Sequence, residues 1–313
     1  MSRILTVTLN PALDLATSTP AVVPNQKLRC GPETAEPGGG GVNVARAVSQ
    51  LGGTATAVVA LGGATGTALG DLLRALPFDL IEVPAPGDTR HSFAVTDTAQ
   101  NAQYRFVLNG PHWSDVQIAT FLGRIVQTVR SGDLLILSGS MPPGASPGFV
   151  TQVCDTLPNC NVVVDTSGPH LHALAQAPQP APAVLRMDSH EARDLSGSML
   201  ETQHESASFA ESLRRKGVAK TIIIARGKDG SVMADESGLW HVTAANTHVV
   251  SAIGAGDSFI GGFVLGLQQK HSTTEALYMG SAAAAAACLS EGTQLCHYED
   301  WMHMRSQTKL TRL

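Results

Sequence analysis

The sequence predicts an α/β protein with a mostly parallel central sheet. Short apolar runs rich in β-branched residues alternate with helix-like stretches along the chain. Continuously apolar strands separated by helices are typical of a parallel sheet that is buried on both faces. The apolar runs are residues 4–9, 55–61, 134–137, 162–164 and 221–225, and the helix-like stretches include residues 41–51, 67–75, 114–129, 206–216 and 274–289. A chain of 313 residues has room for one large domain or for two smaller ones.

Two segments interrupt this rhythm and predict a small second sheet. Residues 16–36 are rich in Thr, Pro and Val and have little helical periodicity. Residues 89–108 contain two alternating stretches, which predict a hairpin with its turn near residues 98–101. We therefore expect a small antiparallel sheet that projects from the main body and serves as a lid, a dimer surface or both.

Composition and charge exclude several classes of protein. Apolar residues make up 43% and charged residues 15% of the chain, which is typical of globular rather than disordered proteins. A net charge of −5 gives no broad attraction to nucleic acid or to an anionic membrane. No apolar run approaches the roughly 18 residues that a membrane span needs, and residues 4–9 have strand length rather than signal-peptide length. The five cysteines never form a C-x-x-C pair, which indicates a reducing, cytoplasmic location without a disulfide framework or zinc ribbon.

The most informative segment is residues 251–267, where a Gly254-Ala255-Gly256 turn and Asp257 lead into an apolar helix. Free backbone N–H groups at a helix N-terminus bind anions, and the helix dipole strengthens this binding. Asp257 then has two interpretations of about equal weight. It is an ordinary helix N-cap, or it accepts the proton of an attacking hydroxyl while the turn stabilises charge on a phosphoryl group.

A second Gly-rich stretch, residues 38–41, is followed by Asn43. A dinucleotide-binding fingerprint must directly follow a strand, and the last clear strand before this stretch ends at Leu9, so a nicotinamide-dependent oxidoreductase is excluded on context. The chain also lacks the G-x-x-x-x-G-K-[ST] pattern of Walker-type NTPases. Two interpretations remain, a flexible loop before a helix and a close approach of bare backbone to a polyol beside the Asn43 amide.

Weaker signals come from one turn and from separated cations. Residues 225–230 form a Gly-containing turn after a strand, which by itself indicates no more than a β-turn. Four cations fall in the two segments of the expected small sheet, namely Lys27, Arg29, Arg90 and Arg105. Single surface cations are usually solvated, but their joint placement favours a phosphate clamp. The eleven histidines show no metal-ligand spacing.

Together these segments resemble the ribokinase-like (PfkB-type) carbohydrate kinases. Residues 38–47 are similar to the first signature of this family and residues 253–257 to its second, with further similarity at residues 9–14, 137–144 and 291–293. Within the family the chain is most similar to the minor bacterial 6-phosphofructokinases, on residues 27–30, 103–107 and the four glycines at 38–41. Residues 8–14 are closer to the 1-phosphofructokinases and tagatose-6-phosphate kinases.

The resemblance implies a three-layer α/β/α fold with a mostly parallel central sheet and a small β-sheet lid. It implies one domain over residues 1–313, with a discontinuous lid from about residues 16–36 and 89–108. The implied activity is ATP-dependent phosphorylation of a phosphorylated ketohexose, first of all fructose 6-phosphate, with Mg²⁺ bridging the ATP phosphates. The partners implied are the phosphosugar, ATP and a second copy of the chain that binds through the lid.

The resemblance also assigns roles to individual residues. Asp257 would be the general base, with Gly254, Ala255 and Gly256 as the anion hole. The sugar hydroxyls would contact Asp14, Gly39, Gly40 and Asn43, and the existing phosphate would contact Lys27, Arg90, Arg105 and Ser140. The nucleotide would lie along Arg186, Asp188, Ala225, Gly227 and Gly230, and Glu191 would position Mg²⁺ through water.

Several residues depart from the family pattern. Arg186-Met-Asp188-Ser-His190-Glu191 stands where the family has Lys-Pro-Asn-x-x-Glu, and Ala225 and Ala252 replace hydroxyl residues. Each missing hydroxyl removes a donor that contributes about 0.5–1.5 kcal/mol to binding. These departures keep two alternatives open. One is a tagatose-6-phosphate or 1-phosphofructose kinase, and the other is a sugar-phosphate sensor that has lost nucleotide handling.

Overall fold

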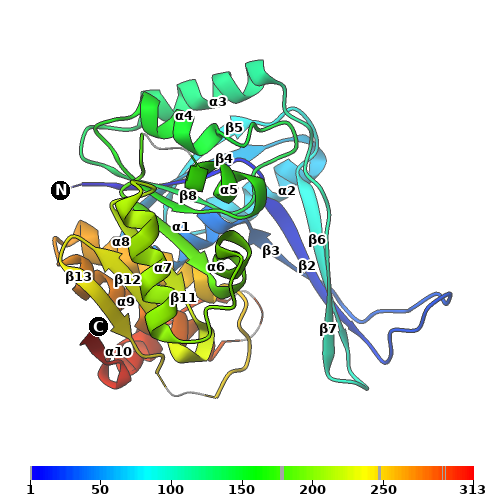
Figure 1. Ribbon diagram of the computed structural model, residues 1–313. Coiled ribbons are helices and arrows are strands. Elements are labelled where there is room, and N and C mark those ends of the chain that lie inside the picture. The colour runs from blue at the N-terminus through cyan, green and yellow to red at the C-terminus, as the bar shows by residue number, and fades with distance from the viewer. Residues whose placement is uncertain (1, 177–179, 246–247, 291, 293) are drawn as a thin grey trace.

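The computed structural model describes residues 2–176, 180–245, 248–290, 292 and 294–313. It confirms the predicted fold class, because a large sheet is covered by helices on both faces and a smaller sheet stands beside this body (Figure 1). Glu291 and Thr293, which carry part of the family resemblance, lie outside the described residues. Within the described part of the chain, no helix is long and apolar enough to cross a membrane.

The main sheet contains ten strands in the described ranges, in the order β14-β13-β12-β11-β10-β9-β8-β1-β4-β5. Neighbours from β11 to β5 are parallel, and β12, β13 and β14 extend the β11 edge in antiparallel pairs. The strands are β1 (Ile4–Thr8), β4 (Ala55–Leu61), β5 (Asp79–Pro84), β8 (Leu134–Ser138), β9 (Asn161–Asp165), β10 (Val184–Asp188), β11 (Thr221–Ala225), β12 (Ser231–Asp235), β13 (Gly238–Val242) and β14 (Leu310–Arg312). All five strands predicted from apolar runs are present, as β1, β4, β8, β9 and β11.

The helices begin at recognisable capping residues. In α3, α7 and α9 a Ser or Thr accepts a hydrogen bond from the backbone three residues on, and the Gln or Glu there bonds back to the cap. The helices are α1 (Gly40–Gln50), α2 (Gly63–Arg74), α3 (Asp115–Thr128), α4 (Phe149–Thr156), α5 (Gly168–Gln176), α6 (Ser189–Ser196), α7 (Gln203–Arg215), α8 (Ala255–Gln268), α9 (Thr273–Ala287) and α10 (Tyr298–Gln307). A short 3₁₀ turn, η1 (Gly227–Asp229), follows β11.

Two apolar cores lie on opposite faces of the main sheet. One joins the strands to α3, α4, α5, α6 and α7, and the other joins them to α1, α2, α8 and α9. Strand β8 contributes alternately to both, with Leu135 and Leu137 in the first core and Leu134 and Ile136 in the second. Burial on both faces explains why this strand has a continuous apolar run instead of a period of two.

The smaller sheet has the strand order β3-β2-β6-β7, with β2 (Ala12–Thr19), β3 (Thr34–Gly38), β6 (Arg90–Asp97) and β7 (Ala102–Val107). The predicted hairpin is confirmed as the antiparallel pair of β6 and β7, with residues 98–101 between them. The expectation of a purely antiparallel sheet is wrong, because β2 and β6 pair in parallel. Both strands follow parallel strands of the main sheet, β1 and β5, and leave its carboxyl edge in the same direction.

Strand β3 corrects the argument that no strand precedes the Gly-rich stretch. It ends at Gly38 and leads directly into α1. The segment contains Pro37 and has no β-branched run, so no sequence pattern predicts a strand there. Pro37 is tolerated because β3 is the edge strand of the smaller sheet. The pairing with β2 is antiparallel, which differs from the parallel β-α-β unit of a dinucleotide site.

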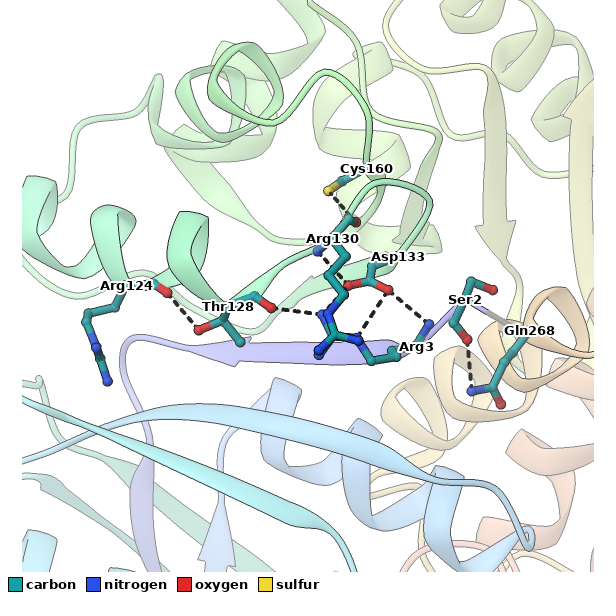
Figure 2. Close-up of polar contacts among 8 residues, drawn as sticks. All are labelled: Ser2, Arg3, Arg124, Thr128, Arg130, Asp133, Cys160 and Gln268. Carbon is teal, nitrogen blue, oxygen red and sulfur yellow. Dashed lines mark hydrogen bonds and ion pairs between the residues drawn. The ribbon is translucent and has the colours of Figure 1, made fainter.

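A polar cluster joins the amino ends of β1 and β8 (Figure 2). Arg3 Nη2 lies 2.6 Å from Asp133 Oδ2 and donates to the Thr128 carbonyl at 2.8 Å. The Arg130 backbone N–H donates to the same carboxylate at 2.8 Å. Because the strands are parallel, this cluster lies at the edge of the sheet opposite the residues that the sequence analysis selected for chemistry.

Candidate active site

The predicted site residues gather at the carboxyl ends of the parallel strands. Ser138, Asp165 and Arg186 follow one another in register across β8, β9 and β10, and Asp188 pairs with Ala225 of β11. In the main sheet β1 has β4, the next main-sheet strand along the chain, on one side and β8 on the other. Open α/β sheets bind ligands outside the carboxyl ends of their strands at such a switch point.

Helix α8 begins in the conformation that an anion site requires. Gly254 is its N-cap, with φ +73° and no side-chain cap. A Cβ atom there would lie 2.4 Å from Leu295 Cδ2, so both backbone angle and space favour glycine. The first N–H groups of a helix have no acceptor within it, so Gly256 and Asp257 present donors at the positive end of the dipole, whereas the Ala255 N–H donates to the Ala252 carbonyl at 3.4 Å. The interpretation of Asp257 as an ordinary N-cap is wrong, since Gly254 occupies that position.

The Asp257 carboxylate is held by two side chains from other elements. Asn43 Nδ2 of α1 donates to Asp257 Oδ2 at 2.9 Å. Ser138 Oγ at the end of β8 donates to Asp257 Oδ1 at 3.4 Å. The two Gly-rich stretches therefore meet at this carboxylate, one through Asn43 and the other through the start of α8.

The environment of Asp257 moves its pKa toward neutrality. Burial raises the pKa to about 6, and the negative charge of Asp165 acts in the same direction. The hydrogen bonds from Asn43 and Ser138 and the positive charge of Arg186 lower it, but by less than burial raises it. A carboxylate with this pKa is ionised at neutral pH and still basic enough to accept a proton from a hydroxyl group.

The Gly-rich loop lies directly against Asp14 and Ser138. A Cβ atom on Gly38 would lie 2.1 Å from Asp14 Oδ2, and one on Gly40 would lie 2.5 Å from Ser138 Oγ. Gly39, the N-cap of α1, has φ +116°. Burial raises the pKa of Asp14, while a hydrogen bond from Ser92 and nearby arginines lower it. The loop thus brings bare backbone between two polar side chains, as the polyol interpretation requires.

Arg90 and Ser140 are joined by Asn10, a residue to which the sequence analysis assigned no role of its own. Arg90 Nε donates to the Asn10 carbonyl at 3.3 Å, and Asn10 Nδ2 donates to Ser140 Oγ at 3.3 Å. The three residues line one cavity of about 460 Å³ with His170. The Asn-Pro dipeptide that ends β1 was the only sequence signal for Asn10.

The other two candidate phosphate ligands lie apart from this cavity. Arg105 lines a second cavity of about 280 Å³ between the smaller sheet and the loop before α8, together with Asp14, Ser92 and Ile253. Lys27 is exposed in the connection between β2 and β3. Figure 1 shows this connection extending away from the α/β body, so a single chain does not bring Lys27 to Arg90 and Ser140.

Arg186 lies beneath the turn that begins α8. Its Nη1 is 3.2 Å from Asp165 Oδ2, and the side chains of both residues are 13% exposed. A Cβ atom on Gly256 would lie 3.1 Å from the same Nη1. The guanidinium therefore supports the anion site from below and keeps a buried carboxylate paired. Asp165 is a further residue that the sequence analysis missed, because a single Asp after a short apolar run has no distinctive pattern.

Asp188 and Glu191 form a capping box at the start of α6. Asp188 Oδ1 accepts from the Glu191 backbone N–H at 2.9 Å, and Glu191 Oε2 accepts from the Asp188 N–H at 2.7 Å. Each carboxylate keeps a second oxygen without a hydrogen bond among the described residues. Burial raises the pKa of Glu191 to about 7. The two oxygens that remain free among the described residues would fit water ligands of Mg²⁺. No group of three or more metal-ligating side chains occurs in the described residues.

The turn after β11 has two glycines in left-handed conformations. Gly227 has φ +59° and an open surrounding, whereas a Cβ atom on Gly230 would lie 1.9 Å from the Val242 carbonyl oxygen. The close approach of β13 is thus a structural reason for Gly230. Ala225 ends β11 beside Asp188, and His190 is exposed, with Nδ1 3.0 Å from Arg193 Nη2.

Comparison with known proteins agrees with this geometry. The chain is 35% identical to the ATP-dependent 6-phosphofructokinase isozyme 2 of Escherichia coli, over 96% of this chain and 97% of that protein. It is 28% identical to the 1-phosphofructokinase of Bacillus subtilis, over 99% of this chain and 100% of that protein.

Solved structures of phosphofructokinase-2 are also similar to this chain. Phosphofructokinase-2 from Escherichia coli in complex with fructose-6-phosphate superimposes with a TM-score of 0.88 at 34% identity, covering 98% of this chain and 99% of that one. The tetrameric inhibited form of that enzyme superimposes with a TM-score of 0.90 at the same identity and coverage. The family model of the pfkB carbohydrate kinases matches residues 8–301. The chain therefore belongs to the pfkB family of carbohydrate kinases.

Proposed function

We propose that this kinase transfers the γ-phosphoryl group of ATP to the C1 hydroxyl of fructose 6-phosphate. The observation that carries the proposal is Asp257, an acid with a pKa of about 6 at the N-terminus of α8. It is supported by 35% identity to a 6-phosphofructokinase over nearly the whole chain. The products are fructose 1,6-bisphosphate and ADP.

In the proposed reaction Asp257 accepts the proton of the C1 hydroxyl. The C1 oxygen forms a bond to the γ-phosphorus in line with the bond that breaks between this phosphorus and the β–γ bridging oxygen. Charge on the transferred group is stabilised by the N–H groups that follow Gly254, in a position that the bare Gly256 leaves accessible. Asn43 and Ser138 keep the carboxylate oriented through the reaction.

The phosphosugar is proposed to lie between the two sheets. Its hydroxyls would contact Asp14, the backbone of Gly39 and Gly40, and Asn43. Its phosphate would contact Arg90 and Ser140, which Asn10 already joins, with Arg105 on the adjacent cavity wall. Phosphate is recognised by such charge-assisted donors, and guanidinium groups suit it best.

The placement of Lys27 in the proposal depends on a second copy of the chain. On one face of the smaller sheet the cross-strand pair Phe93 and Phe106 is exposed, with relative exposures of 37% and 53%. An apolar sheet surface of this kind favours self-association, so we propose that residues 16–36 and 89–108 form a lid and the contact of a homodimer. In that dimer the exposed connection that carries Lys27 would reach a phosphate in the partner.

ATP is proposed to lie along the carboxyl ends of β10 and β11. Arg186 and Asp188 would face its phosphates, and Ala225 with Gly227 and Gly230 would line the nucleotide. Mg²⁺, when bound, would neutralise the ATP phosphates, and Asp188 and Glu191 would hold its water ligands. The unpaired cysteines support a cytoplasmic location.

Two alternatives have an observation in their favour. The 28% identity to a 1-phosphofructokinase supports a kinase for fructose 1-phosphate or tagatose 6-phosphate. The replacement of hydroxyl residues by Ala225 and Ala252 supports a sensor that binds sugar phosphate without turnover.

Measuring ADP release with Mg-ATP and each of the three phosphosugars distinguishes the proposed function from these two alternatives. A higher kcat/KM for fructose 6-phosphate supports the proposal, and a higher value for either other sugar replaces it. If folded protein turns over none of them, the proposed kinase function is rejected in favour of the sensor.

A further inference from the structure

Arg46, in the second turn of α1, contacts Asn43, the residue that holds Asp257. The proposed mechanism gives Arg46 no role. Its Nη1 donates to Asn43 Oδ1 at 3.2 Å and to the Pro37 carbonyl at 3.2 Å. The side chain is half-buried. It therefore contacts both the amide that holds Asp257 and the residue that precedes the Gly-rich loop.

The contact with Arg46 decides which end of the Asn43 amide faces Asp257. A guanidinium group only donates hydrogen bonds, so its partner must be the amide oxygen. The amide nitrogen is then left to donate to Asp257 Oδ2, at 2.9 Å. The reversed amide would set its oxygen against the carboxylate and its NH₂ group against the guanidinium, which makes two repulsive contacts. Arg46 thus reinforces the one amide orientation that an ionised Asp257 accepts, since a carboxylate only accepts and a guanidinium only donates.

The second contact fixes the position of the loop. Pro37 is followed at once by Gly38, whose Cα lies against the Asp14 carboxylate. A donor on the Pro37 carbonyl therefore ties the loop over Asp14 to the same helix that carries Asn43. One side chain links the proposed sugar-binding loop to the proposed base.

The charges around Arg46 are mostly negative. Burial lowers the pKa of Arg46, while the nearby carboxylates of Glu36, Asp14 and Asp257 raise it. Asp257 is faced by Asp165 of β9 and Arg186 of β10 as well. Arg186 lowers the pKa of Asp257 from the β10 side although it is paired with Asp165, and Arg46 adds positive charge on the α1 side.

We propose that Arg46 is a positioning residue that holds the Asn43 amide with its donor end toward Asp257 and keeps that carboxylate ionised. The inference rests on the proposed function in so far as Asp257 is the general base. Its structural part, the control of Asp257 through Asn43, holds for any substrate.

The first test needs no substrate. Protein with ¹³C-labelled aspartate carboxyl groups is titrated by NMR, and the Asp257 signal is identified by its absence in Asp257→Asn. In Arg46→Met the titration midpoint of Asp257 is expected to rise by about one pH unit, because a nearby opposite charge is lost. Arg46→Lys, which keeps the charge, returns the midpoint toward the wild-type value. An unmoved midpoint in folded Arg46→Met overturns the proposal.

Arg3→Met is the control, since Arg3, like Arg46, donates to a backbone carbonyl and to a side-chain oxygen, in its case of Asp133, but lies at the opposite edge of the sheet. It is expected to lower the melting temperature and to leave the Asp257 midpoint unchanged. A shift as large as that of Arg46→Met would show a general effect of destabilisation and overturn the proposal. If Arg46→Met does not fold, Arg46→Gln replaces it, because Gln keeps a donor but removes the charge.

The second test measures turnover across pH. Arg46→Met is expected to lower kcat with fructose 6-phosphate about 10–100-fold, as a misplaced reacting group does, and to move the acid limb of kcat/KM to higher pH. An equal loss at every pH would indicate a merely structural role and overturn the proposal. If the wild-type protein turns over none of the three phosphosugars, the proposed function fails, and the NMR titration still decides the role of Arg46.

Discussion

Asn43 and Asp257 are 214 residues apart in the sequence, and Asn43 Nδ2 lies 2.9 Å from Asp257 Oδ2. The contact joins the first turn of α1 to the first turn of α8, so each of its two residues comes from the helix that follows a Gly-rich stretch. Ser138 completes the arrangement from the end of β8. The proton acceptor of the proposed reaction is thus positioned by three segments that the fold brings to one edge of the sheet.

The Asn43 contact predicts a change in pH dependence. Asn43→Asp places a second carboxylate beside Asp257, and two adjacent carboxylates do not ionise together, so the shared proton is lost only at higher pH. We expect kcat/KM to fall more at pH 6.5 than at pH 8.5. Ser138→Ala removes the longer contact, of 3.4 Å, and is expected to move the acid limb in the same direction by less. An equal reduction at both pH values for Asn43→Asp would contradict this role.

Ionisation of Asp257 is predicted to lower the stability of the fold. The pKa rises from 3.8 to about 6 on folding, mainly through burial. The folded state therefore binds the proton more tightly, and this contribution is complete below pH 3.8 and is lost as the pH rises through 6. Relative to wild type, Asp257→Asn should gain on the order of 2 kcal/mol in the free energy of unfolding between pH 4 and pH 7.5. Urea unfolding at several pH values checks this, and a difference that does not change with pH would refute it.

Gly254 is predicted to be essential for the start of α8. Gly254→Ala puts a side chain at φ +73° and against Leu295, which should cost about 1–2 kcal/mol and lower kcat by displacing the turn. Gly197→Ala is the matched control, because Gly197 has φ +67° but no atom near its Cβ position. It should lose similar stability while keeping the wild-type kcat. Equal effects of the two variants on kcat would show that the α8 turn has no special role.

Arg90 is predicted to act on sugar binding rather than on the chemical step. Arg90→Met removes a charge-assisted donor beside Ser140 and should raise KM for fructose 6-phosphate about 10–100-fold, with a smaller change in KM for ATP. Arg124→Met is a suitable control, since Arg124 lies on α3 and its side chain hydrogen-bonds only to Gln127 among the described residues. Steady-state kinetics with each substrate varied in turn distinguishes the two effects. An unchanged KM for the sugar would remove Arg90 from the proposed phosphate site.

The sequence predicted the parts of this fold that depend on local pattern. Continuous apolar runs identified β1 and β8, and the turn of Gly254 before Asp257 identified the start of α8. Strand β3 was missed because an edge strand that contains Pro37 needs no apolar run. The parallel pairing of β2 and β6 was also missed, since it follows from the edge of the main sheet that both strands leave.

The sequence predicted the motifs of the candidate site, but not the hydrogen bonds and the ion pair that join them. Asn10, Ser138 and Arg46 lie in segments that resemble the family, but neither they nor Asp165 have a spacing that assigns a role to the single side chain. They become informative only when the fold brings them to Arg90, Asp257, Arg186 and Asn43. Lys27 is the opposite case. It lies in a segment that the sequence analysis recognised, but in a single chain its loop extends away from the site.

The most direct test of the central claim compares Asp257→Asn with wild type in turnover and in sugar binding. Asn preserves the size of the side chain and accepts a hydrogen bond from Asn43, but it does not take up the C1 proton. We expect turnover of fructose 6-phosphate with Mg-ATP to fall at least about 1,000-fold, while the Kd for the sugar measured by calorimetry stays within about threefold of wild type. Turnover within severalfold of wild type would contradict the assignment of Asp257 as the general base.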